Sequence, residues 1–195
     1  MFLGTVFFTG LALPSITTID AVHFKIIGVP FEIYNTMVAA GMFILTFSKF
    51  LTGFLYDKLG LRTTISISYL AAIISITTLI SINATSSPFV VGLYYVLVDV
   101  ALPLETILLP IFASDLFGKK DYSKFLGLTI SINTLGQALG SSFTLYCFEL
   151  FGSYTVSFYI SLSIMIICLI VFQYVISASK QERKKVEQSL LLNNA

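Results

Sequence analysis

Long apolar runs alternate with short polar segments along the whole chain. A helix needs about 20 apolar residues to cross the hydrocarbon core of a bilayer, and this length recurs throughout the sequence. The six predicted spans cover residues 2–22, 31–56, 63–82, 88–113, 125–150 and 155–178. We therefore predict an all-α integral membrane protein with a six-helix transmembrane bundle at residues 1–178 and a basic tail at residues 179–195.

The composition agrees with a membrane protein, because 56% of the residues are hydrophobic and only 11% are charged. The net charge of +1 argues against binding to nucleic acid. The sequence contains no phosphate-binding loop, zinc motif or nucleophile elbow, so we expect neither an enzyme nor an ATP-driven pump, and no cofactor. Cys147 and Cys168 lie inside spans, which favours buried thiols over a metal site or a disulfide.

The basic residues indicate the orientation, since Lys and Arg near short loops are retained in the cytoplasm. They gather in the segments after the second and fourth spans and in the tail, at Lys58, Arg62, Lys119, Lys120, Lys124, Lys180, Arg183, Lys184 and Lys185. All of these segments fall on one side, and the opposite side offers only Lys25 with His23. We expect a multi-pass protein of the plasma membrane with both termini in the cytoplasm. The apolar run begins at once after Met1, which suggests a truncated start.

Two segments resemble a known family. The first reads Gly53-x-Leu55-x-Asp57-Lys58-x-Gly60-x-Arg62 and resembles the cytoplasmic loop signature of the major facilitator superfamily. The second reads Leu116-Phe117-Gly118-Lys119-Lys120-x-Tyr122, continues through Gly127, Gly136, Gly140 and Phe151-Gly152-Ser153-Tyr154 to Phe158, and is similar to the C-terminal half of oxalate/formate-antiporter-like and monocarboxylate-porter-like members. The resemblance implies one six-helix half, equivalent to helices 7–12 of the superfamily fold.

The resemblance also implies a function. Such carriers enclose a solute path between two halves and work by alternating access. We therefore expect secondary active transport, by antiport or symport, of a small organic solute such as a monocarboxylate or another organic anion, coupled to a proton or a counter-substrate. An N-terminal six-helix half or a second copy would be needed as partner within the lipid bilayer. The alternatives are a membrane scaffold or regulatory subunit without transport, and an inactive fragment.

The signature residues Gly53, Asp57, Lys58, Gly60 and Arg62 have two interpretations. In the superfamily this region is associated with gating, with ion pairs that hold one conformation and break in the other. The alternative is topology alone, because the same positive charges would orient the chain in either case.

Lys49 is the candidate anion-binding residue of the second span. It shares a stripe with Gly53 and Asp57 at four-residue intervals. Related carboxylate carriers often have a basic residue, typically Arg, eight positions before the loop aspartate. A lysine offers a compact charge where an arginine offers a two-pronged grip. The alternative is a lysine that snorkels to the cytoplasmic interface.

The fourth span carries Asp99 and Glu105, which a six-residue separation places about 120° apart on a regular helix. Either carboxyl group can take up a proton during transport, or form a static structural pair. Glu105 lies at a depth similar to that of Lys49, so an ion pair between them is conceivable. Asp20, near the outer end of the first span, is interpreted as interfacial.

The fifth span has one polar and small face at helical spacing, formed by Thr129, Asn133, Gly136, Gln137, Gly140, Ser141 and Thr144. We assign Gly136 and Gly140 to close helix packing. Asn133 and Gln137 either line the solute path or form packing hydrogen bonds. The third and sixth spans contain no charged residue and are expected to face lipid.

Overall fold

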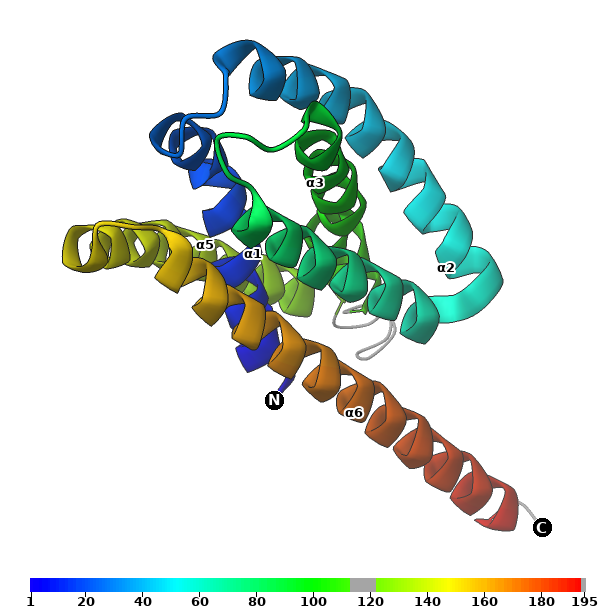
Figure 1. Ribbon diagram of the computed structural model, residues 1–195. Coiled ribbons are helices and arrows are strands. Elements are labelled where there is room, and N and C mark those ends of the chain that lie inside the picture. Colours follow the sequence, from blue (N-terminus) through cyan, green and yellow to red (C-terminus); the bar gives the residue numbers. More distant parts are fainter. Residues whose placement is uncertain (113–121, 194–195) are drawn as a thin grey trace.

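The computed structural model describes residues 1–112 and 122–193, with side chains up to residue 178, and the regular structure of this part is entirely helical (Figure 1). The elements are α1 (Phe2–Ile26), α2 (Phe31–Ser81), α3 (Pro88–Ala101), the π-helix η1 (Leu104–Leu108), α5 (Tyr122–Phe151) and α6 (Thr155–Asn193). The helices long and apolar enough to cross a membrane are Phe2–Ile26, Phe31–Ser81, Pro88–Phe112 and Thr155–Ala178. The prediction of an all-α fold with helices of membrane-spanning length is confirmed.

α2 is a 51-residue element in which two helices meet at a kink at Gly60. The two spans predicted on either side of the signature segment correspond to these two helices, and the turn between them is shorter than the predicted segment 57–62. At a rise of about 1.5 Å per residue a straight helix of this length would span about 75 Å, more than twice the hydrocarbon core. Gly60 instead has φ 76° and ψ 169°, a conformation essentially restricted to glycine, and the chain folds back there into two arms, residues 31–59 and 61–81 (Figure 1).

The helix that begins at Pro88 changes its hydrogen bonding halfway. Ser87 Oγ accepts a bond from the Phe89 amide at 3.3 Å and caps the helix, while Pro88 occupies its first turn, where a missing N–H is harmless. Pro103 has no N–H to donate, so the regular ladder is interrupted, and the π-helix η1 follows directly. Glu105 lies within this π-helix.

α6 continues through the predicted tail to Asn193, so this segment is a helical extension rather than a separate region (Figure 1). The side chains of its basic residues lie outside the described part of the chain. The same holds for Lys119 and Lys120 and for the segment of the second family-like motif before Tyr122. The orientation inferred from these charges therefore stays a prediction.

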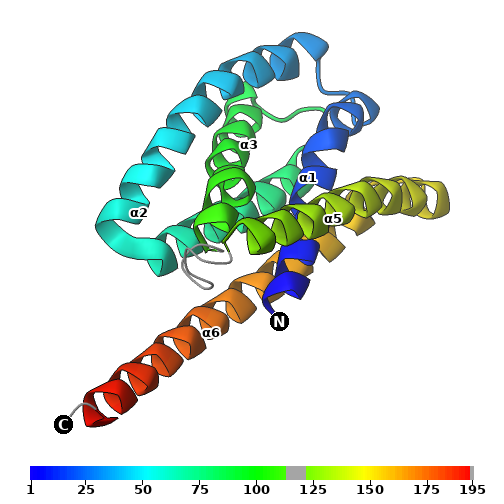
Figure 2. The same ribbon diagram turned by 180° about the vertical axis from the view of Figure 1, so that it is seen from behind.

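α1 occupies the centre of the bundle. It crosses α5 closely and also packs on α6, while α2 packs mainly on α3 (Figure 2). An aromatic cluster links α1, the end of the fourth span and α6, since the ring of Phe112 lies 4.8 Å from that of Phe2 and 5.2 Å from that of Phe172, centroid to centroid. A buried hydroxyl contact joins Thr9 of α1 to Tyr69 of α2 at 2.6 Å.

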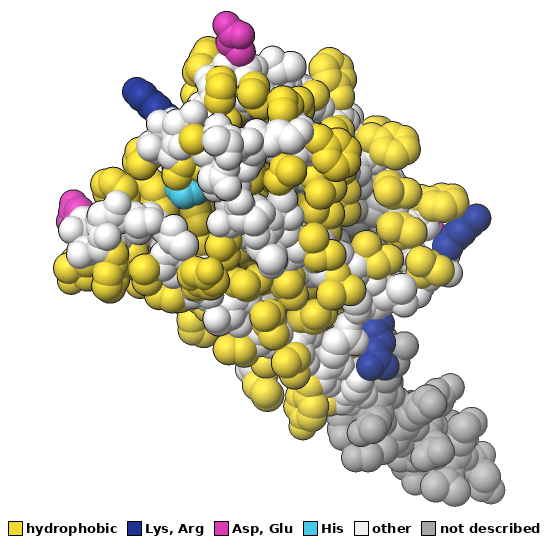
Figure 3. Space-filling view, in the orientation of Figure 1, with side chains coloured by type: hydrophobic (Ala, Val, Ile, Leu, Met, Phe, Trp, Pro, Cys, Tyr) yellow, Lys and Arg dark blue, Asp and Glu magenta, His cyan; other side chains and the backbone are white. Residues whose placement is uncertain are grey.

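The outer surface is largely apolar. Side chains of the second arm of α2 and of α6 are exposed, among them Leu70, Ile74, Ile166, Ile167 and Ile170. In the space-filling view, hydrophobic atoms cover much of the visible face and the few charged side chains lie at its edges (Figure 3). This surface is suited to lipid, as expected for the two uncharged spans.

Candidate functional site

A cavity of about 200 Å³ lies between α1, the first arm of α2 and α3. Its polar lining comes from Thr17 and Asp20 of α1 and from Tyr95 and Asp99 of α3. The remaining walls are Gly41 and the apolar side chains Val38, Met42, Leu45, Val98 and Leu102. We call this space the acidic cavity.

Asp20 is buried in this cavity, with 6% of its surface exposed. One carboxylate oxygen accepts a hydrogen bond from the Ala21 amide at 2.6 Å, and the other accepts one from the hydroxyl of Tyr94 at 3.0 Å. The interpretation of Asp20 as an interfacial residue did not foresee this burial. The sequence signal for this burial is the position of an acidic residue inside an apolar run. The sequence does not indicate the hydrogen bond to Tyr94, because Tyr94 lies on another helix.

Asp99 is also buried, at 7% exposure, yet its Oδ2 has no hydrogen-bond partner in the part of the chain that the structure describes. The hydroxyl of Tyr95, likewise buried, has none either. A buried polar atom without a partner costs free energy because it has given up its bonds to water. Gly41 makes room for the carboxylate, since a methyl group there would lie 2.5 Å from Asp99 Oδ2.

Glu105 belongs to a second polar group, away from the acidic cavity. Its Oε1 accepts a bond from Asn133 Nδ2 at 3.5 Å and its Oε2 accepts one from Gln137 Nε2 at 3.4 Å. Gln137 also donates to Asn133 Oδ1 at 2.7 Å, and Asn133 Nδ2 reaches the carbonyl of Val6 in α1 at 3.4 Å. We call Glu105, Asn133 and Gln137 the amide cluster. Three residues predicted for the solute path thus lie together.

Asp99 and Glu105 face different partners, in agreement with their six-residue spacing. Asp99 points toward α2, whereas Glu105 points toward α5. Glu105 accepts hydrogen bonds from the side-chain amides of Asn133 and Gln137 instead of forming the ion pair with Lys49 that the sequence suggested.

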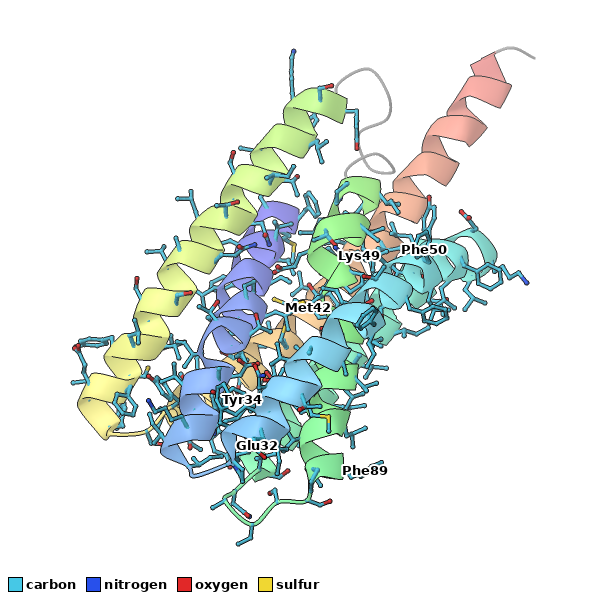
Figure 4. All side chains as sticks on the ribbon, turned by 90° about the horizontal axis from the view of Figure 1, so that it is seen from above. Glu32, Tyr34, Met42, Lys49, Phe50 and Phe89 are labelled. Atoms are coloured by element: carbon cyan, nitrogen blue, oxygen red, sulfur yellow. The ribbon has the colours of Figure 1, made fainter. Side chains whose placement is uncertain are left out.

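Lys49 is exposed on the first arm of α2. It stands seven residues, about two turns, beyond Met42, so the two side chains share one face of the helix (Figure 4). Met42 lines the acidic cavity. Leu45, also in the cavity wall, is four residues before Lys49, so Lys49 lies about 6 Å along the helix axis beyond the cavity lining, on the same side.

The signature residues lie around the bend of α2. The ammonium of Lys58 stands 4.5 Å from the centroid of the Phe54 ring, a cation–π contact. Arg62 Nε donates to Gln173 Oε1 of α6 at 2.6 Å, and Gln173 Nε2 donates to Ser66 and to the Arg62 carbonyl. Asp57 is exposed. The bend is thus fastened to α6 through Arg62, and ion pairing at this loop stays a prediction.

Gly136 and Gly140 lie where α5 crosses α1. A methyl group at Gly136 would collide with the Phe7 carbonyl, and one at Gly140 would collide with the Leu11 carbonyl. The crossing also uses Gly10 of α1, where a methyl group would strike the backbone of Asn133. Glycine on both helices lets the two backbones touch.

Comparison with known proteins gives one result. The family model described as Major Facilitator Superfamily matches residues 1–192. No curated protein and no solved structure gave a match.

Proposed function

Because the chain belongs to the Major Facilitator Superfamily, whose members are membrane transporters, we propose that it moves a small organic solute by secondary active transport. The solute would cross by alternating access, coupled to a proton or a counter-substrate as symporter or antiporter. The observation that carries this proposal is the buried polar lining of a bundle that otherwise presents apolar side chains. Polar groups at membrane depth are costly, and they mark solute or ion pathways.

The arrangement of helices supports a six-helix half equivalent to helices 7–12. Counting the two arms of α2 separately, residues 1–112 and 122–193 form six long helical segments, with Pro88–Phe112 as the fourth. A partner half, supplied by an N-terminal six-helix unit or by a second copy, would complete the path. We further propose the plasma membrane as location and cytoplasmic termini, on the distribution of basic residues.

For the solute we propose a carboxylate group held by Lys49. The ammonium of Lys49 is exposed on the face of α2 that also forms a wall of the acidic cavity. A partner half covering this face would place the charge in a low-dielectric path, where it attracts an anion strongly. This supports a monocarboxylate or a related organic anion as cargo. The amide cluster would offer neutral donors on the neighbouring wall, and the signature loop would act as the gate.

Uptake of radiolabelled monocarboxylates by cells that produce the protein tests the role of Lys49. We expect Lys49→Ala to lower anion uptake at least tenfold and Lys49→Arg to retain much of it, because the positive charge is kept. Lys25→Ala is the matched control, since it removes an exposed lysine at the end of α1 and should change nothing. Equal uptake by wild type and Lys49→Ala, at equal amounts in the membrane, would remove the anion from the proposal.

A further inference from the structure

The described residues that line the acidic cavity include two carboxylates and no basic side chain. In the part of the chain that the structure describes, Asp20 is held by hydrogen bonds from the Ala21 amide and the Tyr94 hydroxyl and, most weakly, by the Tyr95 hydroxyl, none of them basic, and Asp99 Oδ2 has no hydrogen-bond partner. An ionised carboxylate removed from water without a positive partner costs several kcal/mol even after relaxation. The cavity therefore favours a positively charged guest.

The oxygen atoms specify what kind of positive charge fits. Asp99 Oδ2 and the Tyr95 hydroxyl are buried without a hydrogen-bond partner, and Asp20 lines the same space. A proton on Asp99 would occupy one carboxylate oxygen and leave the Tyr95 hydroxyl without a hydrogen-bond partner. A primary ammonium group has three N–H donors, which matches the three acceptor groups. Its charge also strengthens each hydrogen bond.

The apolar lining distinguishes an organic ammonium from a metal ion. The part of the ligand next to its charged group would contact apolar side chains, namely Val38, Met42, Leu45, Val98 and Leu102. Hard metal cations take six or more oxygen ligands, and the described residues include no group of three or more His, Cys, Asp or Glu that could hold a metal ion.

We infer that the acidic cavity binds the primary ammonium group of a small organic solute, with the ammonium between Asp20, Tyr95 and Asp99 and an alkyl chain against the apolar wall. Combined with a carboxylate at Lys49, which rests on the proposed function, the solute is a zwitterionic amino carboxylate. The ammonium site itself does not depend on Lys49. It therefore predicts binding even if no carboxylate is carried.

Thermal stabilisation of the full chain in lipid nanodiscs by n-butylammonium chloride tests the site, because a ligand of the folded state raises the unfolding temperature in a saturable way. We expect saturable stabilisation by n-butylammonium and none by NaCl at the same ionic strength. Asp99→Asn and Gly41→Ala should weaken the apparent affinity at least tenfold, the latter by forcing Asp99 aside. Gly4→Ala is the matched control, since a methyl group there meets nothing within 4 Å, and its affinity should stay within twofold.

Tyr95→Phe tests the site even if the other variants fail to fold, because it removes only a hydroxyl that has no hydrogen-bond partner. We expect it to weaken n-butylammonium binding severalfold. The assignment would be overturned if Tyr95→Phe and Asp99→Asn, as single variants, both bound n-butylammonium with wild-type affinity. Stabilisation of the wild type by Na⁺ alone would also overturn it. Because the measurement needs no transport, a protein that binds the amine but carries nothing would refute the proposed function and leave the ammonium site standing.

Discussion

The crossing of α1 and α5 gives the sharpest prediction about stability. Replacing Gly140 by alanine places a methyl group against the carbonyl oxygen of Leu11. Because this obstacle is backbone, no change of side-chain rotamer can relieve it, and the two helices must separate. Forcing an extra group into a packed interface costs about 1–3 kcal/mol. Alanine returns about 0.5–1 kcal/mol through its better helix propensity. The net loss should be about 0–2.5 kcal/mol.

The matched control is Gly127→Ala on the same helix, where a methyl group has no described atom within 4 Å. This variant should be neutral or stabilising by up to about 1 kcal/mol, since only helix propensity changes. Unfolding in mixed micelles of increasing SDS content, followed by far-ultraviolet circular dichroism, gives both free energies. If Gly140→Ala and Gly127→Ala unfold at the same SDS fraction, the close crossing of α1 and α5 is refuted.

Three further substitutions probe separate contacts in the same unfolding assay. Gly60→Ala should lower the unfolding free energy by about 1–3 kcal/mol, because φ 76° with ψ 169° is strained for alanine, and an unchanged value would contradict the sharp bend of α2. Tyr69→Phe should lower the unfolding free energy by about 0.5–1.5 kcal/mol, because it removes the buried hydrogen bond with Thr9. The same substitution should leave the unfolding free energy unchanged in a Thr9→Val background. Equal losses in the two backgrounds would exclude the bond. Gln173→Leu should cost about 0.5–1.5 kcal/mol by releasing Arg62, whereas Gln173→Glu should retain the contact as an ion pair; equal losses in the two variants would argue against it.

The sequence predicted the helical membrane fold because periodicity and length are local properties. The predicted span at 88–113 corresponds closely to Pro88–Phe112, and the polar face of the fifth span places Asn133 and Gln137 toward the centre. The pairing of those amides with Glu105 was not predicted. It depends on how two helices cross and on a π-turn after Pro103, neither of which has a local sequence signal.

The acidic cavity shows the same limit more strongly. Asp20 and Asp99 are 79 positions apart, and nothing in the sequence of either span indicates that the two carboxylates meet. The packing of α1, α2 and α3 brings them into one cavity. The absence of a side chain at Gly41 leaves room there for the Asp99 carboxylate. The bend at Gly60 was anticipated as a turn, but its reduction to a single residue required knowledge of the backbone conformation.

Counterflow in proteoliposomes tests the central claim of solute transport most directly. Vesicles containing the chain with its partner half, or the chain alone at high density, are loaded with unlabelled solute and diluted into a trace of the labelled compound, over a panel of small monocarboxylates and amino carboxylates. A carrier working by alternating access predicts a transient accumulation of label that saturates with solute concentration. A signal that rises linearly with concentration and never exceeds that of protein-free vesicles, for every solute and both preparations, would contradict the account and favour a scaffold without transport.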